Sequence, residues 1–277
     1  MTATAKPPVQ SSRFFAEPQG GPLIIAHRGG SLEAPENTLA ALRHGVASHA
    51  SWQEIDVGLS ADDACIVLHD DSVSRTTNGV GNLAEWPLSH LTTLSAGRPK
   101  WHPETQQTLA RLGVHEVPDF GDRYAEERVP TLEQALAVPG VRLMIELKPT
   151  IKPEILMQKV VRAVELANMG AQVAIGTFDP PLLAMAARLA PELPRIGILE
   201  DPLLAPLMLG LDVRALAVHA DLVPLMRAQV PKHVAVWTWT VYTLQCAQGL
   251  ARSGADGLIT DIPAQLVQAH RTGRLAG

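Results

Sequence analysis

The sequence predicts an α/β protein folded as one (β/α)8 barrel of the TIM type, with a small cap insertion after the second strand. Its 277 residues match the usual size of such a barrel. Short apolar runs alternate with helical patterns through the second half of the chain, which is typical of a parallel sheet. Two further apolar runs in the first half bring the strands to eight, the number that closes a barrel.

The first two strands are predicted at 22–27 and 51–57, with a helix at 36–49 between them. An open doubly wound sheet is the alternative architecture. No Gly-x-Gly-x-x-Gly pattern follows the first strand, and this absence disfavours a dinucleotide-binding fold.

A strand-like run at 64–70 follows the second strand too closely for a parallel crossover, which needs about a dozen residues. We therefore expect a hairpin over 58–70 that returns His69 to the rim of the barrel. Residues 71–130 lack the alternation, and a connection this long is unusual without structure of its own. We expect them to form a cap over the barrel mouth, followed by a helix with Thr131 as its N-cap.

The second half of the chain supplies the other six strand–helix units. In the first of these helices, Pro153 is placed to begin the helix and Gly170 to end it. The strands are predicted at 141–148, 171–176, 194–199, 213–219, 233–239 and 256–260.

Residues 1–21 are predicted to form a flexible N-terminal arm, and residues 22–277 a single domain. The arm lacks the apolar stretch of a signal peptide. No apolar run reaches the ~20 residues of a membrane span. We therefore expect a cytoplasmic protein without stable membrane insertion.

The composition, with 46% hydrophobic and 18% charged residues, is typical of a globular protein. A net charge of −5 without a basic block argues against nucleic acid or an anionic membrane as the main partner. Cys65 and Cys246 lie far apart in apolar surroundings, which favours buried free thiols over a disulfide or a zinc site.

Three carboxylates lie at predicted strand ends, where the chemistry of such barrels is located. Glu54 and Asp56 are two residues apart and face one side of their strand, and Glu146 lies near the end of the next barrel strand. Carboxylates that share one mouth repel each other unless a cation separates them, and such ligands suit Mg²⁺ or Ca²⁺. The alternative is an ionic network in which they pair with Arg28 and Lys148.

Two histidines also lie at strand ends, and imidazole titrates near neutral pH. His27 and His69 are therefore candidates for a general base or a general acid, with structural rings as the alternative. Arg28 carries a forked, permanent charge suited to a phosphate, and Lys148 is expected to neutralise the same group. The glycines at 29–30 are expected to let the backbone pass close to the ligand.

The sequence does not decide the role of two aromatic side chains. Trp239 and Phe178 follow strands and are candidates for substrate contact, with core packing as the alternative. His102, His115 and Glu116 lie in the insertion without ligand spacing, so we interpret them as surface or cap-packing residues.

The ordered set of motifs resembles the glycerophosphodiester phosphodiesterase family from about residue 23 to 263. The combination of His-Arg-Gly, Pro-Glu-Asn-Thr, Glu-x-Asp, His-Asp and Arg-Thr-Thr-Asn-Gly is highly specific, whereas a lone His-Arg-Gly would mean little. The matching stretches are AHRGGSLEAPENT, EIDVGLSADDACIVLHDDSVSRTTNGVG, VPTLEQAL, MIELKP, VAIGTFDP, VAVWTWTV and GADGLITDIP.

The resemblance implies a (β/α)8 barrel with one divalent metal that hydrolyses glycerophosphodiesters to sn-glycerol 3-phosphate and an alcohol. Glu36 and Asn37 look like residues that order the site, outside the catalytic set. Carried over motif by motif, the family's catalytic histidines fall on His27 and His69, its metal carboxylates on Glu54, Asp56 and Glu146, and its phosphate contacts on Arg28 and Lys148.

The mechanism that this implies starts with His27 removing a proton from a glycerol hydroxyl, which then attacks phosphorus. His69 protonates the leaving alcohol, and water opens the resulting cyclic phosphate. Direct attack by water is the competing route, and the roles of the two histidines can be exchanged.

The sequence departs from the family pattern at two places that bear on the substrate. Tyr242 replaces the usual Asn after Trp-Thr-Val, and the segment from Arg98 to Arg128 is longer than the usual connection. One alternative is a related barrel phosphodiesterase that acts on lysophospholipids, in the manner of a lysophospholipase D. A non-catalytic phosphate-binding barrel is another.

Overall fold

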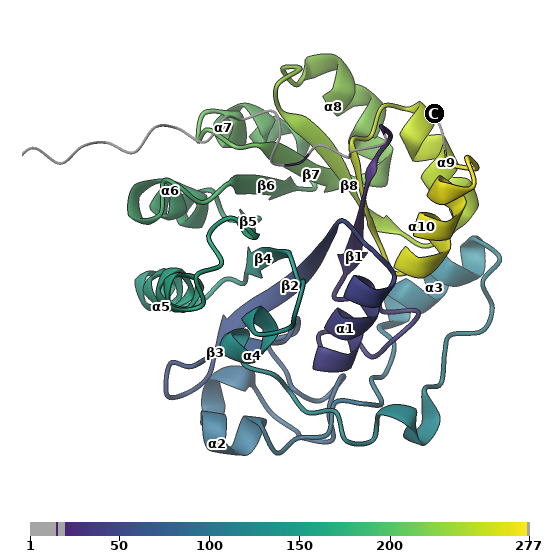
Figure 1. Ribbon diagram of the computed structural model, residues 1–277. Coiled ribbons are helices and arrows are strands. Elements are labelled where there is room, and N and C mark those ends of the chain that lie inside the picture. Colours follow the sequence, from purple (N-terminus) through teal and green to yellow (C-terminus); the bar gives the residue numbers. More distant parts are fainter. Residues whose placement is uncertain (1–14, 16–19, 276–277) are drawn as a thin grey trace, which may run out of the picture.

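The computed structural model describes residue 15 and residues 20–275. Eight parallel strands close into a barrel, which confirms the predicted fold class (Figure 1). The barrel is closed because β1 pairs with both β2 and β9. In chain order the barrel strands are β1 Leu23–His27, β2 Trp52–Leu59, β4 Leu143–Leu147, β5 Val173–Thr177, β6 Arg195–Leu199, β7 Ala215–His219, β8 Ala235–Val241 and β9 Gly257–Thr260.

Helices follow the barrel strands and cover their outer face (Figure 1). Side-chain caps begin several of them, as at Thr131, whose hydroxyl accepts a hydrogen bond from the Gln134 amide as predicted. The helices are α1 Leu39–Ala47, α4 Leu132–Leu136, α5 Pro153–Leu166, α6 Pro180–Leu189, α7 Ala205–Leu209, α8 Val223–Gln229, α9 Leu244–Arg252 and α10 Pro263–Arg271, with the short 3-10 turns η3 Pro202–Leu204 and η4 Ala220–Leu222 before α7 and α8.

Helix α5 begins at Pro153 as predicted, but the prediction that Gly170 ends it is wrong. The helix ends at Leu166, and Asn168 adopts a left-handed conformation with φ of 57°. The Met169 amide then donates a hydrogen bond back to the Val164 carbonyl, which satisfies the end of the helix. Asparagine tolerates this conformation, so the turn occurs before the glycine is reached.

The hairpin and the insertion follow β2. Strand β3, Cys65–Val67, pairs antiparallel with β2, which confirms the predicted excursion. The insertion then forms η1 Leu83–Glu85, α2 Leu88–Leu91, α3 Pro103–Arg111 and η2 Gly121–Tyr124. It packs on a small core of its own, made of Ile66, Leu68, Val73, Leu83, Leu91, Leu94, Ala96 and Val129.

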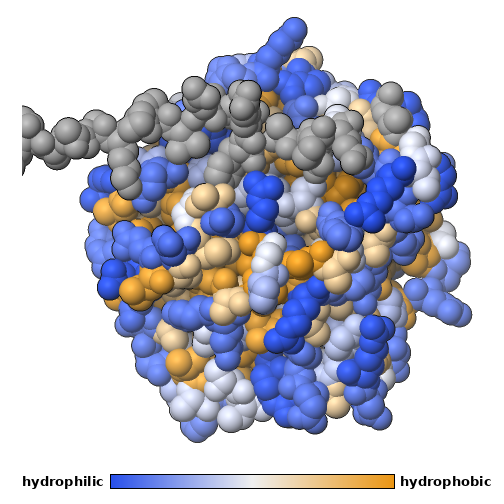
Figure 2. Space-filling model, viewed as in Figure 1, coloured by the Kyte–Doolittle hydropathy of each residue, from blue (hydrophilic) through white to orange (hydrophobic). Residues whose placement is uncertain are grey.

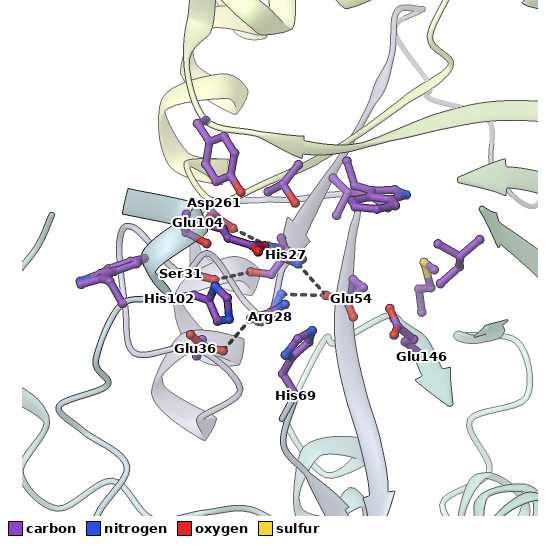
Figure 3. Close-up of a pocket in the computed structure, with 18 of the residues that line it drawn as sticks. His27, Arg28, Ser31, Glu36, Glu54, His69, His102, Glu104, Glu146 and Asp261 are labelled. Atoms are coloured by element: carbon purple, nitrogen blue, oxygen red, sulfur yellow. Dashed lines mark hydrogen bonds and ion pairs between the residues drawn. The ribbon is translucent and has the colours of Figure 1, made fainter. Parts of the chain in front are cut away.

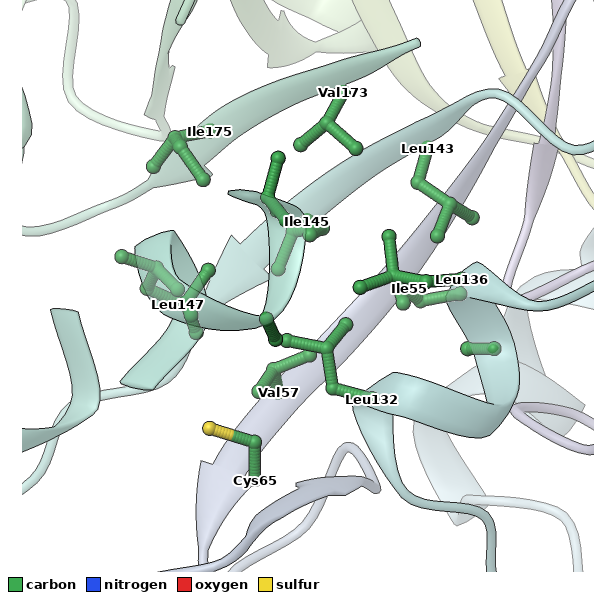
Figure 4. Close-up of a cluster of buried hydrophobic side chains, with 14 of the residues drawn as sticks. Ile55, Val57, Cys65, Leu132, Leu136, Leu143, Ile145, Leu147, Val173 and Ile175 are labelled. Carbon is green, nitrogen blue, oxygen red and sulfur yellow. The ribbon is translucent and has the colours of Figure 1, made fainter. Parts of the chain in front are cut away.

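Alternate residues of the barrel strands divide into two sets, because successive side chains of a strand point to opposite faces. The outward set packs under the helices, as between β2, β4, β5 and α4 (Figure 4). The inward set fills the barrel with side chains that include Ile25, Trp52, Met144, Ile196, Ala217, Trp237 and Ile259.

The inward side chains fill the barrel interior below the strand ends that carry the site. An added Cβ on Gly257 would lie 2.6 Å from the Trp237 indole, so glycine makes room for this ring. The ring of Phe15 packs edge-on against Trp52 and Trp237, with centroid distances of 5.3 and 4.8 Å. Apart from Phe15, Gly20 and Gly21, the predicted arm of residues 1–21 lies outside the described residues, and its flexibility stays a prediction.

Cys65 and Cys246 are free thiols, as predicted, although only Cys65 is fully buried. Burial raises the pKa of the Cys65 thiol to about 12. The face shown in Figure 2 carries mostly hydrophilic side chains at its periphery, with apolar ones gathered toward its centre. Within the described part of the chain, no helix combines the length and apolar character that crossing a bilayer requires.

Candidate active site

A cavity of about 300 Å³ opens where the barrel strands end. Inward-facing residues of several strands line it, and in β1, β2 and β4 the side chains that come after the apolar filling are polar. The cavity brings together every site residue predicted from the sequence except Asp56, which is buried among its lining residues. The predicted residues that line it are His27, Arg28, Glu54, His69, Glu146, Lys148, Phe178 and Trp239.

The three predicted metal carboxylates form one buried cluster. Glu54, Asp56 and Glu146 each offer an oxygen, and these oxygens all lie within 4.8 Å of one another. In register, Asp56 of β2 lies opposite Glu146 of β4. Burial, together with the charges of Asp56 and Glu146, raises the pKa of Glu54 well above its usual range. Glu54 Oε1 is buried without a hydrogen-bond partner, so the cluster has the uncompensated oxygen that a bound cation would satisfy.

The cationic side chains join the same cluster, so the predicted ionic network is also present. Lys148 Nζ lies 2.8 Å from Asp56 Oδ1 and 2.6 Å from Glu146 Oε1. Arg28 Nε lies 3.2 Å from Asp56 Oδ2. Burial alone would lower the pKa of Lys148, but the two carboxylates raise it above its usual value. The metal and network interpretations are therefore compatible, because Asp56 is paired with cations whereas Glu54 Oε1 is not.

His27 is oriented by a carboxylate from the far end of the chain. Its Nδ1 lies 2.6 Å from Oδ1 of Asp261, which follows β9 and is 3% exposed. A carboxylate accepts hydrogen bonds, so this contact places the ring proton on Nδ1 and leaves the lone pair on Nε2. Nε2 lies 3.9 Å from Glu54 Oε2, which directs it toward the acidic cluster (Figure 3).

His69 has an equivalent carboxylate beside it in the sequence. Its Nδ1 lies 2.6 Å from Asp70 Oδ1, which again leaves Nε2 as the reactive nitrogen. Arg75 holds Asp70 with two hydrogen bonds, from Nε to Oδ2 at 2.6 Å and from Nη2 to Oδ1 at 2.9 Å. The other side of the Arg75 guanidinium donates to Glu36, which also accepts from Arg28 Nη1 at 2.8 Å. One chain of charged groups thus connects His69 to the arginine beside His27.

The turn after β1 shapes this part of the site. Arg28 has a left-handed φ of 53°, and its amide donates to Glu54 Oε2 at 3.0 Å. The structure gives the two glycines a second reason, and the expected close approach to a ligand stays a prediction. A Cβ on Gly29 would lie 2.6 Å from the backbone of Ala41 in α1, and one on Gly30 would lie 2.7 Å from the Pro263 ring. The glycines therefore allow two helices to approach the turn, and neither residue lines the cavity.

The two aromatic candidates lie together at the cavity wall. The rings of Phe178 and Trp239 pack edge-on with centroids 5.5 Å apart, and the Trp239 indole N–H donates to the Ala217 carbonyl at 3.2 Å. Trp237, two residues earlier on β8, is fully buried in the barrel. Both rings thus line the cavity, and Trp239 also packs against the side chains that fill the barrel. Their contact with substrate stays a prediction.

Several residues of the site were not assigned from the sequence. Asp261 directly follows the last predicted strand, 256–260, and this position was the signal that it shares the mouth with His27. Arg75 and Asp70 lie in the His-Asp and Arg-Thr-Thr-Asn-Gly motifs, but no spacing rule predicts that they bind each other. Glu36 and Asn37 do order the site, since Asn37 donates to Asp56 Oδ2 at 2.8 Å.

The insertion also contributes to the cavity, through Trp101, His102, Glu104 and Thr105. The interpretation of His102 as a surface or cap-packing histidine is therefore incomplete, because its ring is exposed but lines the cavity (Figure 3). No periodic pattern surrounds this segment, and its position depends on how the insertion folds over the barrel.

Comparisons with known proteins agree with this geometry. Residues 27–265 match the model of the glycerophosphoryl diester phosphodiesterase family. A glycerophosphodiester phosphodiesterase of Caldanaerobacter subterraneus is 31% identical over 261 residues, covering 91% of this chain and 98% of that protein. A phosphodiesterase of Oleispira antarctica, solved with the product sn-glycerol-3-phosphate, is 29% identical with a TM-score of 0.78, covering 91% of this chain and 97% of that one.

A glycerophosphodiester phosphodiesterase from Agrobacterium tumefaciens has the same fold, with a TM-score of 0.68 at 24% identity, over 89% of this chain and 99% of that one. The family match extends from His27 past Asp261 and so includes both histidines and all three carboxylates of the cluster. The chain therefore belongs to the glycerophosphoryl diester phosphodiesterase family and is a phosphoric diester hydrolase.

Proposed function

We propose that this protein hydrolyses glycerophosphodiesters to sn-glycerol 3-phosphate and an alcohol, by metal-dependent catalysis with two histidines. One observation carries the proposal: His27 and His69 line one cavity, each with Nδ1 bound to a carboxylate and Nε2 left to exchange a proton, beside a buried cluster of three acids. The sn-glycerol-3-phosphate bound to the Oleispira antarctica phosphodiesterase supports the choice of product.

The two histidines carry the proton transfers. His27 Nε2 accepts a proton from the attacking hydroxyl, which belongs to the substrate's glycerol or to water, while Asp261 stabilises the imidazolium that forms. His69 donates a proton from Nε2 to the leaving alcohol, and Asp70 holds its ring in position. In a second hydrolytic step that opens a cyclic phosphate, the two histidines exchange these roles.

Glu54, Asp56 and Glu146 would hold the divalent ion, and their oxygens suit Mg²⁺ or Ca²⁺. Such an ion supplies Lewis-acid stabilisation of phosphoryl charge and lowers the pKa of a hydroxyl next to it. Lys148 and Arg28 add fixed positive charge on the same side of the cavity, where the phosphoryl oxygens gain charge during the reaction. The cytoplasmic location stays a prediction.

The decisive experiment measures release of glycerol 3-phosphate from a panel of glycerophosphodiesters with Mg²⁺, Ca²⁺ or a chelator. We expect turnover with at least one ion and its loss with chelator. Release of glycerol 3-phosphate that is unaffected by chelator would contradict the metal. Binding of a diester without any turnover would favour the non-catalytic phosphate-binding barrel.

A lysophospholipid substrate is the second candidate, because apolar side chains are exposed after three neighbouring strands at the mouth. Ile151 after β4 is 95% exposed, Phe178 after β5 is 37% exposed, and Leu203 after β6 is 83% exposed. Such an edge could receive an acyl chain. Choline release from lysophosphatidylcholine, compared with release from glycerophosphocholine, separates the two candidates.

A further inference from the structure

The two ends of the cavity differ from each other. The two groups that the scissile phosphodiester joins also differ, because one arm is always glycerol and the other is a variable alcohol. One end lies inside the barrel and is closed by the buried side chains of Met144 and Ile198, which are 0% and 3% exposed. The other end lies under the insertion and is open, since His102 and Glu104 are exposed residues. Figure 3 shows His102 and Glu104 on the opposite side of His27 and Arg28 from Glu146. A closed end accepts only a group of constant size, such as the glycerol, whereas the open end has room for the variable alcohol.

The open end is lined by two aromatic rings, those of Trp101 and Tyr242. The Trp101 indole N–H donates to the Pro118 carbonyl at 3.2 Å, so the part of the ring that meets the cavity is its apolar surface. Tyr242 lines the cavity together with Thr105 and Thr240. Burial, and next the charge of Asp261, raise the pKa of Tyr242 to about 12, so the phenol is neutral.

Glu104 differs from the other acids of the cavity in having no partner. Glu36 is bound by Arg28 and Arg75, Glu146 by Lys148, and Asp261 by His27. Among the residues that the structure describes, none forms a hydrogen bond or an ion pair with the side chain of Glu104. The three cations of the lining, Arg28, Arg75 and Lys148, are all occupied by other carboxylates. The open end therefore carries one carboxylate without an ion-pair partner, beside aromatic rings.

We propose that Trp101, Glu104 and Tyr242 form the subsite for the leaving alcohol, and that this subsite selects head groups with a positively charged ammonium, such as choline. The inference rests on the proposed function, because it concerns the alcohol that leaves in the proposed hydrolysis. An ammonium group is attracted both by a carboxylate and by the faces of aromatic rings, and quaternary ammonium groups are bound in this way by aromatic cages. A neutral polyol gains neither attraction, and an anionic head group is repelled by Glu104.

The subsite follows from two departures of this chain that lie far apart in the sequence. Tyr242 comes after β8, and Thr105 belongs to the first turn of α3 in the insertion, yet both side chains line the same cavity. The insertion and the barrel rim therefore both contribute to the part of the cavity where the head group would lie. The tyrosine and the long insertion thus act together on one arm of the substrate.

The test compares kcat/KM for glycerophosphocholine and for the neutral-headed glycerophosphoglycerol, with glycerol 3-phosphate as the readout for both. We expect the wild type to prefer glycerophosphocholine, and Glu104→Gln to lower the ratio of the two kcat/KM values about tenfold, chiefly through KM for glycerophosphocholine. Trp101→Leu should lower the same ratio about fivefold by removing the ring. Raising NaCl from about 0.05 to about 0.5 M should reduce the preference of the wild type but not that of Glu104→Gln.

Glu116→Gln is the matched control, because Glu116 is an exposed acid of the same insertion that does not line the cavity. It should leave the ratio at the wild-type value. An unchanged ratio in Glu104→Gln, equal losses on both substrates, or a preference for glycerophosphoglycerol in the wild type would overturn the subsite while leaving the proposed function intact. Failure of the wild type to release glycerol 3-phosphate from any diester would instead contradict the proposed function.

Discussion

His27 and His69 reach the same cavity with the same kind of partner but by different routes. The carboxylate at His27 belongs to Asp261, 234 residues away, and the two meet because β1 pairs with β9 when the barrel closes. The carboxylate at His69 belongs to the next residue, Asp70, and Arg75 holds it from five residues further on. One histidine is therefore oriented by the complete fold and the other by a local loop.

This difference predicts which substitutions disturb each of the two histidines. Asp261 is 3% exposed, so its carboxylate is sheltered by the barrel and has little freedom to adapt. The Asp70 side chain is 22% exposed and depends on hydrogen bonds from Arg75, which also binds Glu36. A change in the loop should thus disturb His69 first, whereas a change at the barrel seam should disturb His27.

The largest effect is expected from removing either imidazole. His27→Ala and His69→Ala should each lower kcat by about 1,000-fold, because general acid or base catalysis contributes about 100- to 10,000-fold. Metal affinity should remain nearly intact in His69→Ala, as measured by calorimetric titration. His115→Ala, in the exposed part of the insertion, is the control. Near-normal turnover in His69→Ala would refute its assignment.

The second prediction tests the long-range pair. Asp261→Asn should lower kcat by about 100-fold, because a neutral amide neither fixes the Nδ1–H tautomer nor stabilises the imidazolium. Residues that act as one unit are not additive, so this change should have little further effect in a His27→Ala background but a clear one in His69→Ala. Steady-state kinetics of the two double variants measure this. Equal further losses in both would show that Asp261 does not act through His27.

The third prediction tests the local pair. Arg75→Lys should lower kcat about tenfold, because an ammonium cannot reproduce the forked contacts that join Asp70 to Glu36. Arg43→Lys is the control, since the Arg43 side chain is 61% exposed and its nearest carboxylate oxygen, on Glu127, is 3.9 Å away. A normal kcat in Arg75→Lys would remove Arg75 from this role.

The smallest effect concerns stability. Burial would raise the pKa of Asp70, but hydrogen bonds from His69 and Arg75 lower it well below its usual value. Because the folded-state pKa is depressed, the stabilisation is complete above the unfolded pKa of about 3.9 and is lost as pH falls below it. Asp70→Asn should therefore cost about 1 kcal/mol between about pH 5 and 7, and less near about pH 3.5, in urea unfolding. A cost that grows toward acid would contradict this.

Much of the fold could be predicted from the sequence, because strand-like apolar runs and helical patterns alternate along it. Alternation of apolar runs with helical patterns located all eight barrel strands, and the short spacing before 64–70 excluded a parallel crossover there. Strand-end position also identified the acidic cluster and both histidines, since parallel strands of a barrel end at one mouth. Helix ends were less predictable, as at Gly170, because a left-handed turn at Asn168 served as well.

The partners of the site residues depended on the folded chain. Pairing of Asp261 with His27, and of Glu36 with both Arg28 and Arg75, joins positions whose separation in the sequence carries no signal. The placement of Trp101 to Thr105 at the open end of the cavity is of the same kind. Local pattern specifies which face of a strand or helix a side chain occupies, because this follows from backbone geometry. Which groups then come within hydrogen-bond distance is decided by barrel closure and by packing of the insertion, and these are properties of the whole chain.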